Sequence, residues 1–181
     1  MKYTLKDNRT GKELPEFKTD VNIEYGDKEL KFEFYCKNSQ HFCASNEYNG
    51  NIFDGDVCEV FICINGDRHN YYEIEVAPNG VEYLCDTVYK GFDYEIDEPI
   101  LEFRMVEKSF LNSKVEIVGN DYIVKFSIPL EKIDIDNKGS VILNVFRIET
   151  EGGEIDKYLL ALNPTMSDKF HHPEFFIELK K

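Results

Sequence analysis

The chain has 181 residues, of which 42% are hydrophobic, so we expect one folded domain with a substantial core. Acidic residues outnumber basic residues by 35 to 21, and the net charge is −14. A chain this acidic repels polyphosphates and anionic lipid surfaces, so we expect neither nucleic-acid binding nor membrane binding. A neutral ligand is indifferent to the same field, whereas a cation such as calcium is attracted by it.

The sequence shows no signal that fixes its location. No stretch reaches the roughly 18 consecutive apolar residues that a membrane-spanning helix requires. The first 14 residues lack the apolar segment of a secretory signal, which indicates either a cytoplasmic protein or a module excised from a larger secreted protein. The cysteines are odd in number and scattered, so we expect buried free thiols and no disulfide framework. They are Cys36, Cys43, Cys58, Cys63 and Cys85.

The first predicted strands form a hairpin. Apolar residues alternate with polar ones over 21–25 and again over 30–36, on either side of the turn at Gly26, Asp27 and Lys28. Residues 38–51 are polar and follow neither a helical nor a strand period, so we expect a long loop there.

A second hairpin, over residues 52–80, has two different faces. Cys58, Val60, Ile62 and Ile64 form an apolar face that we expect to point into the core, with Tyr72, Ile74 and Val76 after the turn at Asn65–Asp67. The opposite face mixes carboxylates with apolar and aromatic side chains and is our candidate binding surface. Its members are Val57, Glu59, Phe61, Cys63, Tyr71, Glu73 and Glu75.

The remaining chain adds further short strands. We expect a short strand over 81–85, an irregular loop over 87–99, a hairpin joining 115–117 to 122–128, and a short helix from Pro129 to about Ile133. Further strands are expected over 140–150, 158–162 and 175–179. About ten strands with one short helix predict an all-β, antiparallel β-sandwich that forms a single domain over residues 1–181.

Several motifs occur in an order that resembles carbohydrate-binding module family 9. They are GDVCEVFI, a Gly-Asp-Arg turn, NYYEIEVAPNG, YIVKFSIPLEKI, NVFRIE, LALNPT and FHHPEFFIEL, and they extend from about Val21 to Leu179. The resemblance implies a jelly-roll-like sandwich that binds sugar without cleaving it. It also implies sugar held between aromatic rings and polar side chains, with structural calcium in some members.

The resemblance also suggests a set of carbohydrate-binding residues, which are Phe53, Glu59, Glu73, Glu75, Arg147 and Asn163. Glu59 matches a sugar-binding carboxylate, and Phe53 stands near the place of a platform tryptophan. The family motif has tryptophan where Leu162 precedes Asn163, and this chain contains no tryptophan. Tyr48, Tyr89, Phe92 and Tyr94 lie in predicted loops and are candidates to replace it.

Each acidic candidate has a simpler explanation. Glu59 lies between apolar residues and must find a partner, so a structural ion pair with Arg147 or Arg68 is the alternative to a ligand contact. Glu73 and Glu75 follow each other on one strand face, about 6.8 Å apart at their Cα atoms. This spacing could suit a glycosidase, but a solvated strand face is the commoner reason for it.

Metal-ligating residues form no complete motif. The His41–Cys43 pair and the His171–His172 pair are each too few for zinc, and the segment from Asp134 to Val145 lacks the final glutamate of an EF-hand. Asp54 and Asp56 could contribute to a calcium site, although a polar turn is the simpler reading. Structural calcium therefore stays possible, and no metal ligand is assigned.

Two functions remain open. The first is non-catalytic carbohydrate binding through the face that carries Glu59, and the second is a structural or protein-interaction domain that kept the fold and lost the sugar. The absence of tryptophan favours the second. An enzyme is not expected, because no phosphate loop and no Ser/His/Asp pattern is present.

Overall fold

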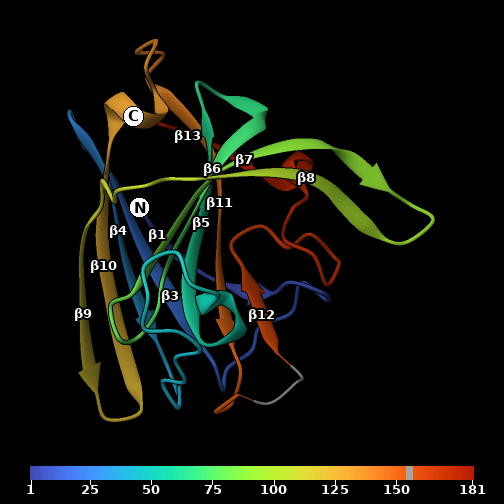
Figure 1. Ribbon diagram of the computed structural model, residues 1–181. Coiled ribbons are helices and arrows are strands. Elements are labelled where there is room, and N and C mark those ends of the chain that lie inside the picture. Colours follow the sequence, from blue (N-terminus) through green and yellow to red (C-terminus); the bar gives the residue numbers. More distant parts are fainter. Residues whose placement is uncertain (154–156) are drawn as a thin grey trace.

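Two antiparallel β-sheets pack face to face in the computed structural model, which describes residues 1–153 and 157–181 (Figure 1). One sheet has five strands in the order β1-β3-β4-β10-β9. They are β1 (Lys2–Thr4), β3 (Thr19–Tyr25), β4 (Glu29–Cys36), β10 (Asp121–Pro129) and β9 (Asn112–Val118). The prediction of an all-β sandwich is confirmed.

The second sheet has eight strands. Its order is β2-β12-β11-β5-β6-β7-β8, and β13 pairs with β11 beside this path. They are β2 (Lys6–Asp7), β12 (Tyr158–Ala161), β11 (Ser140–Glu149), β5 (Val57–Ile64), β6 (Asp67–Val76), β7 (Glu82–Asp93), β8 (Glu98–Met105) and β13 (Ile177–Lys180). The helices are short: η1 (Ile52–Asp54), α1 (Leu130–Ile133) and η2 (Pro173–Phe175). None of the described helices is long and apolar enough to cross a membrane.

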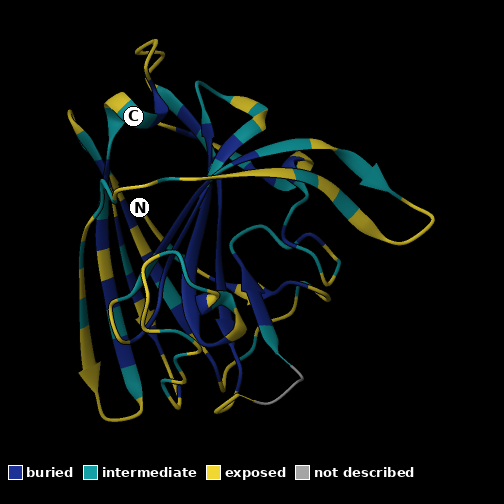
Figure 2. Cartoon of the chain, in the orientation of Figure 1, coloured by how far each residue is buried: buried dark blue, intermediate teal, exposed yellow. Residues whose placement is uncertain are grey.

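The core lies between the two sheets, where alternate residues of each strand point inward. Val60 and Ile62 of β5 pack there with Phe32 and Phe34 of β4, and all four side chains are buried. Strand β5 of the eight-stranded sheet is buried along nearly its whole length, whereas β4 and β10 of the five-stranded sheet alternate between buried and more exposed residues (Figure 2). This arrangement confirms the predicted apolar face of the central hairpin.

The opposite face of β5 and β6 is buried as well, which is unusual for the outer side of a sandwich. Phe61 and Cys63 of β5 belong to a second apolar cluster with Tyr71 of β6, Phe170 and Phe176. The segment after β12 supplies the last two rings and covers this outer face. Cys58 and Cys63 lie on opposite faces of β5, and all five cysteines are free, as the sequence predicts.

The prediction of an irregular loop over 87–99 is wrong. β7 and β8 pair along this stretch and form a long hairpin that extends away from the sandwich (Figure 1). The register shifts between Tyr89 and Gly91, which interrupts the two-residue period on which the prediction depended. Many side chains near the hairpin end are exposed, among them Tyr94 and Ile96, so no burial pattern marks the strands.

The other predicted elements are found within a few residues of their expected ends. The hairpin of β9 and β10, the short helix α1 and the late strands β11, β12 and β13 all form, and residues 38–51 are a loop. The short strands β1 and β2 were not predicted, because each has three residues or fewer and shows no detectable two-residue period.

Candidate functional site

A cavity of about 610 Å³ opens on the outer face of the eight-stranded sheet. Carboxylates form one part of its wall, aromatic rings another, and a few cationic side chains lie at its edge. The lining residues are Arg9, Phe53, Glu59, Phe61, Glu73, Glu75, Tyr83, Phe103, Ile148, Lys157, Leu159, Asp168, Phe170 and His171. They come from strands β5, β6, β7, β8, β11 and β12, from η1 and from three loops.

Strand register brings three glutamates together in this cavity. Glu59 of β5 lies directly opposite Glu75 of β6, and Glu73 is two residues before Glu75 on the same face. One oxygen from each carboxylate lies within 4.8 Å of the others, and all three residues are at most 7% exposed. We call Glu59, Glu73 and Glu75 the glutamate cluster.

The glutamate cluster is poorly supplied with hydrogen bonds. Both oxygens of Glu75 and Oε2 of Glu59 have no hydrogen-bond partner among the described residues. Glu73 accepts a long hydrogen bond of 3.4 Å from the Thr87 hydroxyl, and its Oε1 is 3.8 Å from Nε2 of His171. Buried carboxylates are normally paired or hydrogen-bonded, so this cluster has unused capacity to accept hydrogen bonds.

Burial and mutual repulsion both favour the protonated carboxyls. Burial raises the pKa of Glu73 to about 7. Burial also raises the pKa of Glu59 and of Glu75 well above the ordinary range, and the neighbouring carboxylates raise both further. Protons are therefore shared within the cluster near neutral pH, and the three groups titrate as a unit.

Aromatic side chains surround the glutamate cluster. The ring of Phe53 meets that of Tyr83 edge to face, with centroids 5.6 Å apart. His171 stacks on Phe61 with centroids 4.7 Å apart and contacts the Phe103 ring edge to face at 6.1 Å. Phe103 is 50% exposed, so its ring offers a free apolar surface at the mouth of the cavity.

The cavity contains neutral and cationic groups whose polar atoms are already engaged. Burial lowers the pKa of His171 to about 3, so the ring is neutral, and its Nδ1 is 2.7 Å from the Tyr71 hydroxyl. Arg9 forms an ion pair with the exposed Asp168. Lys157 donates a hydrogen bond of 2.8 Å to the Phe53 carbonyl and lies 3.5 Å from Oδ1 of Asp54.

Four of the six predicted sugar-binding residues line this one cavity, namely Phe53, Glu59, Glu73 and Glu75. Neither Arg147 nor Arg68 forms an ion pair with Glu59 among the described residues. The structural ion pair considered for Glu59 is therefore not formed among the residues that the structure describes.

Arg147 lies elsewhere, between the two sheets. It is directly opposite Cys58 in the pairing of β11 with β5, so it shares the inward-facing side of that strand. Its guanidinium donates to the carbonyls of Phe17 and Lys37, each at 3.1 Å, and to Glu149 Oε2 at 2.5 Å. Because the side chain is fully buried, Arg147 cannot contact a ligand in the cavity.

Asn163 also lies outside the cavity lining. Its side-chain amide donates to the Phe175 carbonyl at 2.7 Å, and its backbone is tied to Asn144 by two hydrogen bonds. These contacts hold the loop after β12 against the chain that leads into β13. Asn163 therefore supports the segment that carries Phe170 and His171.

The sequence did not identify several lining residues, among them Tyr83, Phe103, Lys157 and His171. The four loop aromatics considered as replacements for tryptophan, Tyr48, Tyr89, Phe92 and Tyr94, are not among the residues that line the cavity. For Phe103 a signal existed in the sequence, because Leu101, Phe103 and Met105 alternate with Glu102 and Arg104, as in a strand with one apolar face.

Among the described residues, one group of three ligating side chains is close enough to hold a metal ion, and it is the glutamate cluster. Asp56, considered for calcium, is fully buried and accepts hydrogen bonds from Ser39, Phe42 and Thr150. Its carboxylate therefore joins three segments of chain and has no free oxygen for an ion. Asp54 is engaged by Lys157, as described above.

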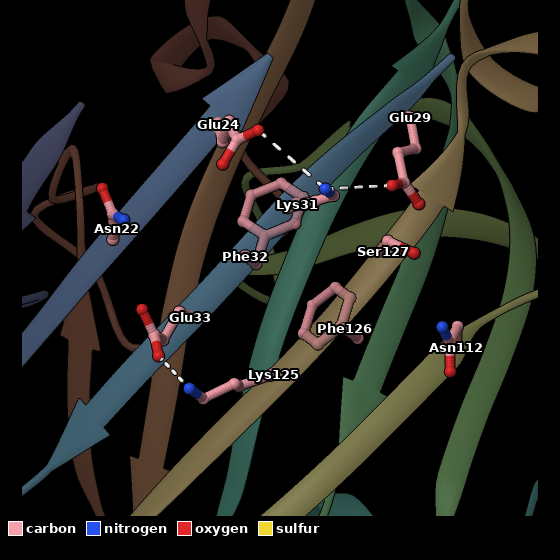
Figure 3. A pocket seen from close by; sticks show the side chains of 10 residues that line it. All are labelled: Asn22, Glu24, Glu29, Lys31, Phe32, Glu33, Asn112, Lys125, Phe126 and Ser127. Carbon is pink, nitrogen blue, oxygen red and sulfur yellow. Dashed lines mark ion pairs between the residues drawn. The ribbon is translucent and has the colours of Figure 1, made fainter. Parts of the chain in front are cut away.

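A second groove, of about 430 Å³, lies on the five-stranded sheet (Figure 3). Its charged side chains neutralise one another: Lys31 pairs with Glu24 and Glu29, and Lys125 pairs with Glu33. Because every carboxylate drawn there has a lysine partner, this groove has no counterpart of the unsatisfied glutamates. The outer cavity of the eight-stranded sheet is the candidate site.

The fold and the cavity together define a two-sheet β-sandwich domain with a ligand-sized recess on one outer face. Neither a family model nor a curated protein matches the sequence. Solved structures do match over nearly the whole chain, and they show that the fold is that of family 9 carbohydrate-binding modules. The resemblance seen in the sequence is thus confirmed at the level of the fold.

Three solved structures illustrate this likeness. A candidate carbohydrate-binding protein from Bacteroides uniformis is 15% identical, with a TM-score of 0.77 over 99% of this chain and 85% of the other. A family 9 module from Caldicellulosiruptor kristjanssonii in complex with glucose is 14% identical, with a TM-score of 0.65 over 98% and 83%. A family 9 module from the same organism with cellotriose is 14% identical, with a TM-score of 0.59 over 92% and 76%.

Proposed function

We propose that this protein is a non-catalytic carbohydrate-binding domain and that the sugar occupies the cavity on the outer face of the eight-stranded sheet. The observation that carries the proposal is the meeting of two features in one recess. Buried carboxylate oxygens without hydrogen-bond partners lie beside the exposed ring of Phe103. A sugar offers the complement to both, since it has hydroxyl donors and an apolar C–H face.

The energetics suit a weak, specific ligand. A hydrogen bond contributes roughly 0.5–1.5 kcal/mol net, or roughly 1.5–3 kcal/mol where the acceptor is ionised, and the free oxygens of Glu59 and Glu75 can accept two or three of them. The volume of about 610 Å³ lies within the range typical of small-molecule pockets. The matched modules were solved with glucose and with cellotriose, which makes β-linked glucose units the first ligands to test.

A hydrolytic function fits the glutamate cluster less well. A glycosidase needs one carboxyl that stays protonated and another that stays ionised, in different environments. Here Glu59, Glu73 and Glu75 share one buried floor, and burial raises the pKa of all three. We therefore assign them to binding.

Titration calorimetry with glucose, cellobiose and cellotriose tests the proposal. We expect saturable binding in the millimolar range or tighter, with the protein shown to be folded by its far-ultraviolet circular dichroism. A folded protein with no heat of binding to any of the three sugars would instead support the alternative, a structural or interaction domain without a sugar ligand.

We expect Phe103→Ala to weaken sugar binding by about tenfold. Stacking on one aromatic ring contributes on the order of 1 kcal/mol beyond its buried area, and the alanine also loses that area. Because the Phe103 ring is half exposed, its removal leaves the core intact. Ile100→Ala, on the same exposed hairpin and equally exposed, is the matched control and should bind like wild type. Equal affinities for both variants would place the sugar elsewhere.

A further inference from the structure

We propose that the preferred ligand of this cavity is an amine-bearing sugar, such as a 2-amino-2-deoxyhexose, whose ammonium group binds at the glutamate cluster. This inference rests on the proposed sugar-binding function and adds the class of sugar. Three observations carry it: the unpartnered oxygens of buried Glu75, the absence of an ion pair to the glutamate cluster from any lysine or arginine of the described residues, and the spacing of the three carboxylates.

Glu75 shows the strongest sign of a missing partner. The residue is fully buried, it lines the cavity, and neither of its carboxylate oxygens has a hydrogen-bond partner among the described residues. Its cross-strand neighbour is another carboxylate, Glu59, and like charges directly opposite each other destabilise a sheet. A buried group of this kind costs stability unless something outside the chain compensates it.

The cations near the cavity provide only part of that compensation: the charge of Lys157 lowers the pKa of Glu59 and of Glu75, but less than burial raises it. Arg9 is paired with Asp168, and Lys157 is bonded to the Phe53 carbonyl and lies near Asp54. Neither forms an ion pair with Glu59, Glu73 or Glu75 in the described part of the chain. The acidic residues lining the cavity outnumber the basic ones, and a cation bound among the raised-pKa glutamates stabilises their ionised form.

The spacing of the glutamate cluster fits an ammonium group. Oxygens that lie within 4.8 Å of one another can all accept from one nitrogen placed between them, at ordinary hydrogen-bond distances of about 2.8 Å. A primary ammonium has three N–H donors, one for each carboxyl. Tyr83 lines the same cavity, and an aromatic ring beside a bound ammonium adds a favourable interaction.

The direct test is titration calorimetry of the wild-type protein with glucosamine, glucose and N-acetylglucosamine, in buffer containing a chelator that keeps divalent cations from the carboxylates. Glucose replaces the ammonium with a hydroxyl of similar size, and N-acetylglucosamine keeps the nitrogen without its charge. We expect glucosamine to bind at least tenfold more tightly than either neutral sugar. Methylammonium, which carries the charge without the ring, should bind much more weakly than glucosamine.

The outcomes separate this inference from the function on which it rests. Glucose binding as tight as glucosamine binding would overturn the preference for an amine and keep the proposed function. Methylammonium binding as tight as glucosamine would overturn the assignment to a sugar. If none of the ligands binds, both proposals fail.

A variant tests the residues. Glu75→Gln should reduce the ratio of glucosamine affinity to glucose affinity by at least tenfold. If this variant does not fold, Glu59→Gln replaces it in the test and should also reduce the ratio. Glu116→Gln, on the exposed edge strand β9, removes one negative charge far from the cavity lining and should keep the wild-type ratio. An unchanged ratio in a folded Glu75→Gln protein would overturn the inference.

Discussion

Replacing Glu73 with glutamine will stabilise the protein at pH 8, and the gain will disappear toward pH 5. Burial raises the pKa of Glu73 to about 7, whereas an ordinary glutamate in the unfolded chain titrates near 4.5. The folded state therefore holds a proton that the unfolded chain has released between these two values. Its stabilising effect is fully present below pH 4.5 and is lost as the pH rises through 7.

The size of this effect follows from the shift. A difference of one pKa unit corresponds to 1.36 kcal/mol, so ionised Glu73 destabilises the fold at pH 8 by about 3 kcal/mol, which glutamine avoids. The glutamine side chain also relieves the repulsion that raises the pKa of Glu75. At pH 5 both side chains are neutral, and the two proteins should be about equally stable.

The measurement is urea unfolding of wild type and Glu73→Gln at pH 5, 6, 7 and 8. Comparing the two proteins matters because His171 acts in the opposite direction: burial lowers the pKa of this imidazole to about 3, so its contribution is lost as the pH falls below 6.5. That contribution is common to both proteins and largely cancels. The free energy of unfolding of Glu116→Gln should change with pH in the same way as that of wild type. Parallel profiles for Glu73→Gln as well would mean that Glu73 is solvated in the folded protein.

Local sequence pattern was sufficient to place the three glutamates on one face, but the solvated face expected for Glu73 and Glu75 is wrong, because both are buried. Strands β5 and β6 form one hairpin, so a two-residue period places Glu59, Glu73 and Glu75 on the same face of the sheet. The fold class followed in the same way from many alternating segments. The two-residue period does not indicate which segment packs against each face of a strand. The sequence therefore did not show that the segment carrying Phe170 and His171 covers the outer face of the sheet.

Arg147, which lies outside the cavity, shows what the sequence pattern could not predict. Strand β11 is apolar on both sides, so its sequence does not reveal which side faces the other sheet. Its register with β5 decides this: Phe146 lies opposite Glu59, and Arg147 lies opposite Cys58. A pairing between segments about 85 residues apart in the chain leaves no local signal. Phe103 differs from Arg147, because it joins the site through a local hairpin in which β8 pairs with the preceding strand β7.

Arg147→Leu will destabilise the protein by about 3–5 kcal/mol, the usual cost of leaving one member of a buried ion pair without its partner. Arg147 and Glu149 are fully buried, and the guanidinium also bonds to the Phe17 and Lys37 carbonyls and to the Thr19 hydroxyl. It lies over the Tyr122 ring at 5.4 Å. Arg147 of β11 thus links the eight-stranded sheet to the start of β3 and to the residue that follows β4 in the other sheet.

Two further measurements separate this structural role from the ligand contact that the sequence resemblance suggests. The double variant Arg147→Leu, Glu149→Leu removes both charges and should recover part of the lost free energy of unfolding, because no buried carboxylate is left unpaired. Arg147→Lys keeps the charge but lacks the planar fork, so it should also be destabilised. Sugar affinity of any variant that stays folded should equal that of wild type, since Arg147 is buried between the sheets, away from the cavity. A stable Arg147→Leu protein with weakened sugar binding would reverse this assignment and return Arg147 to the site.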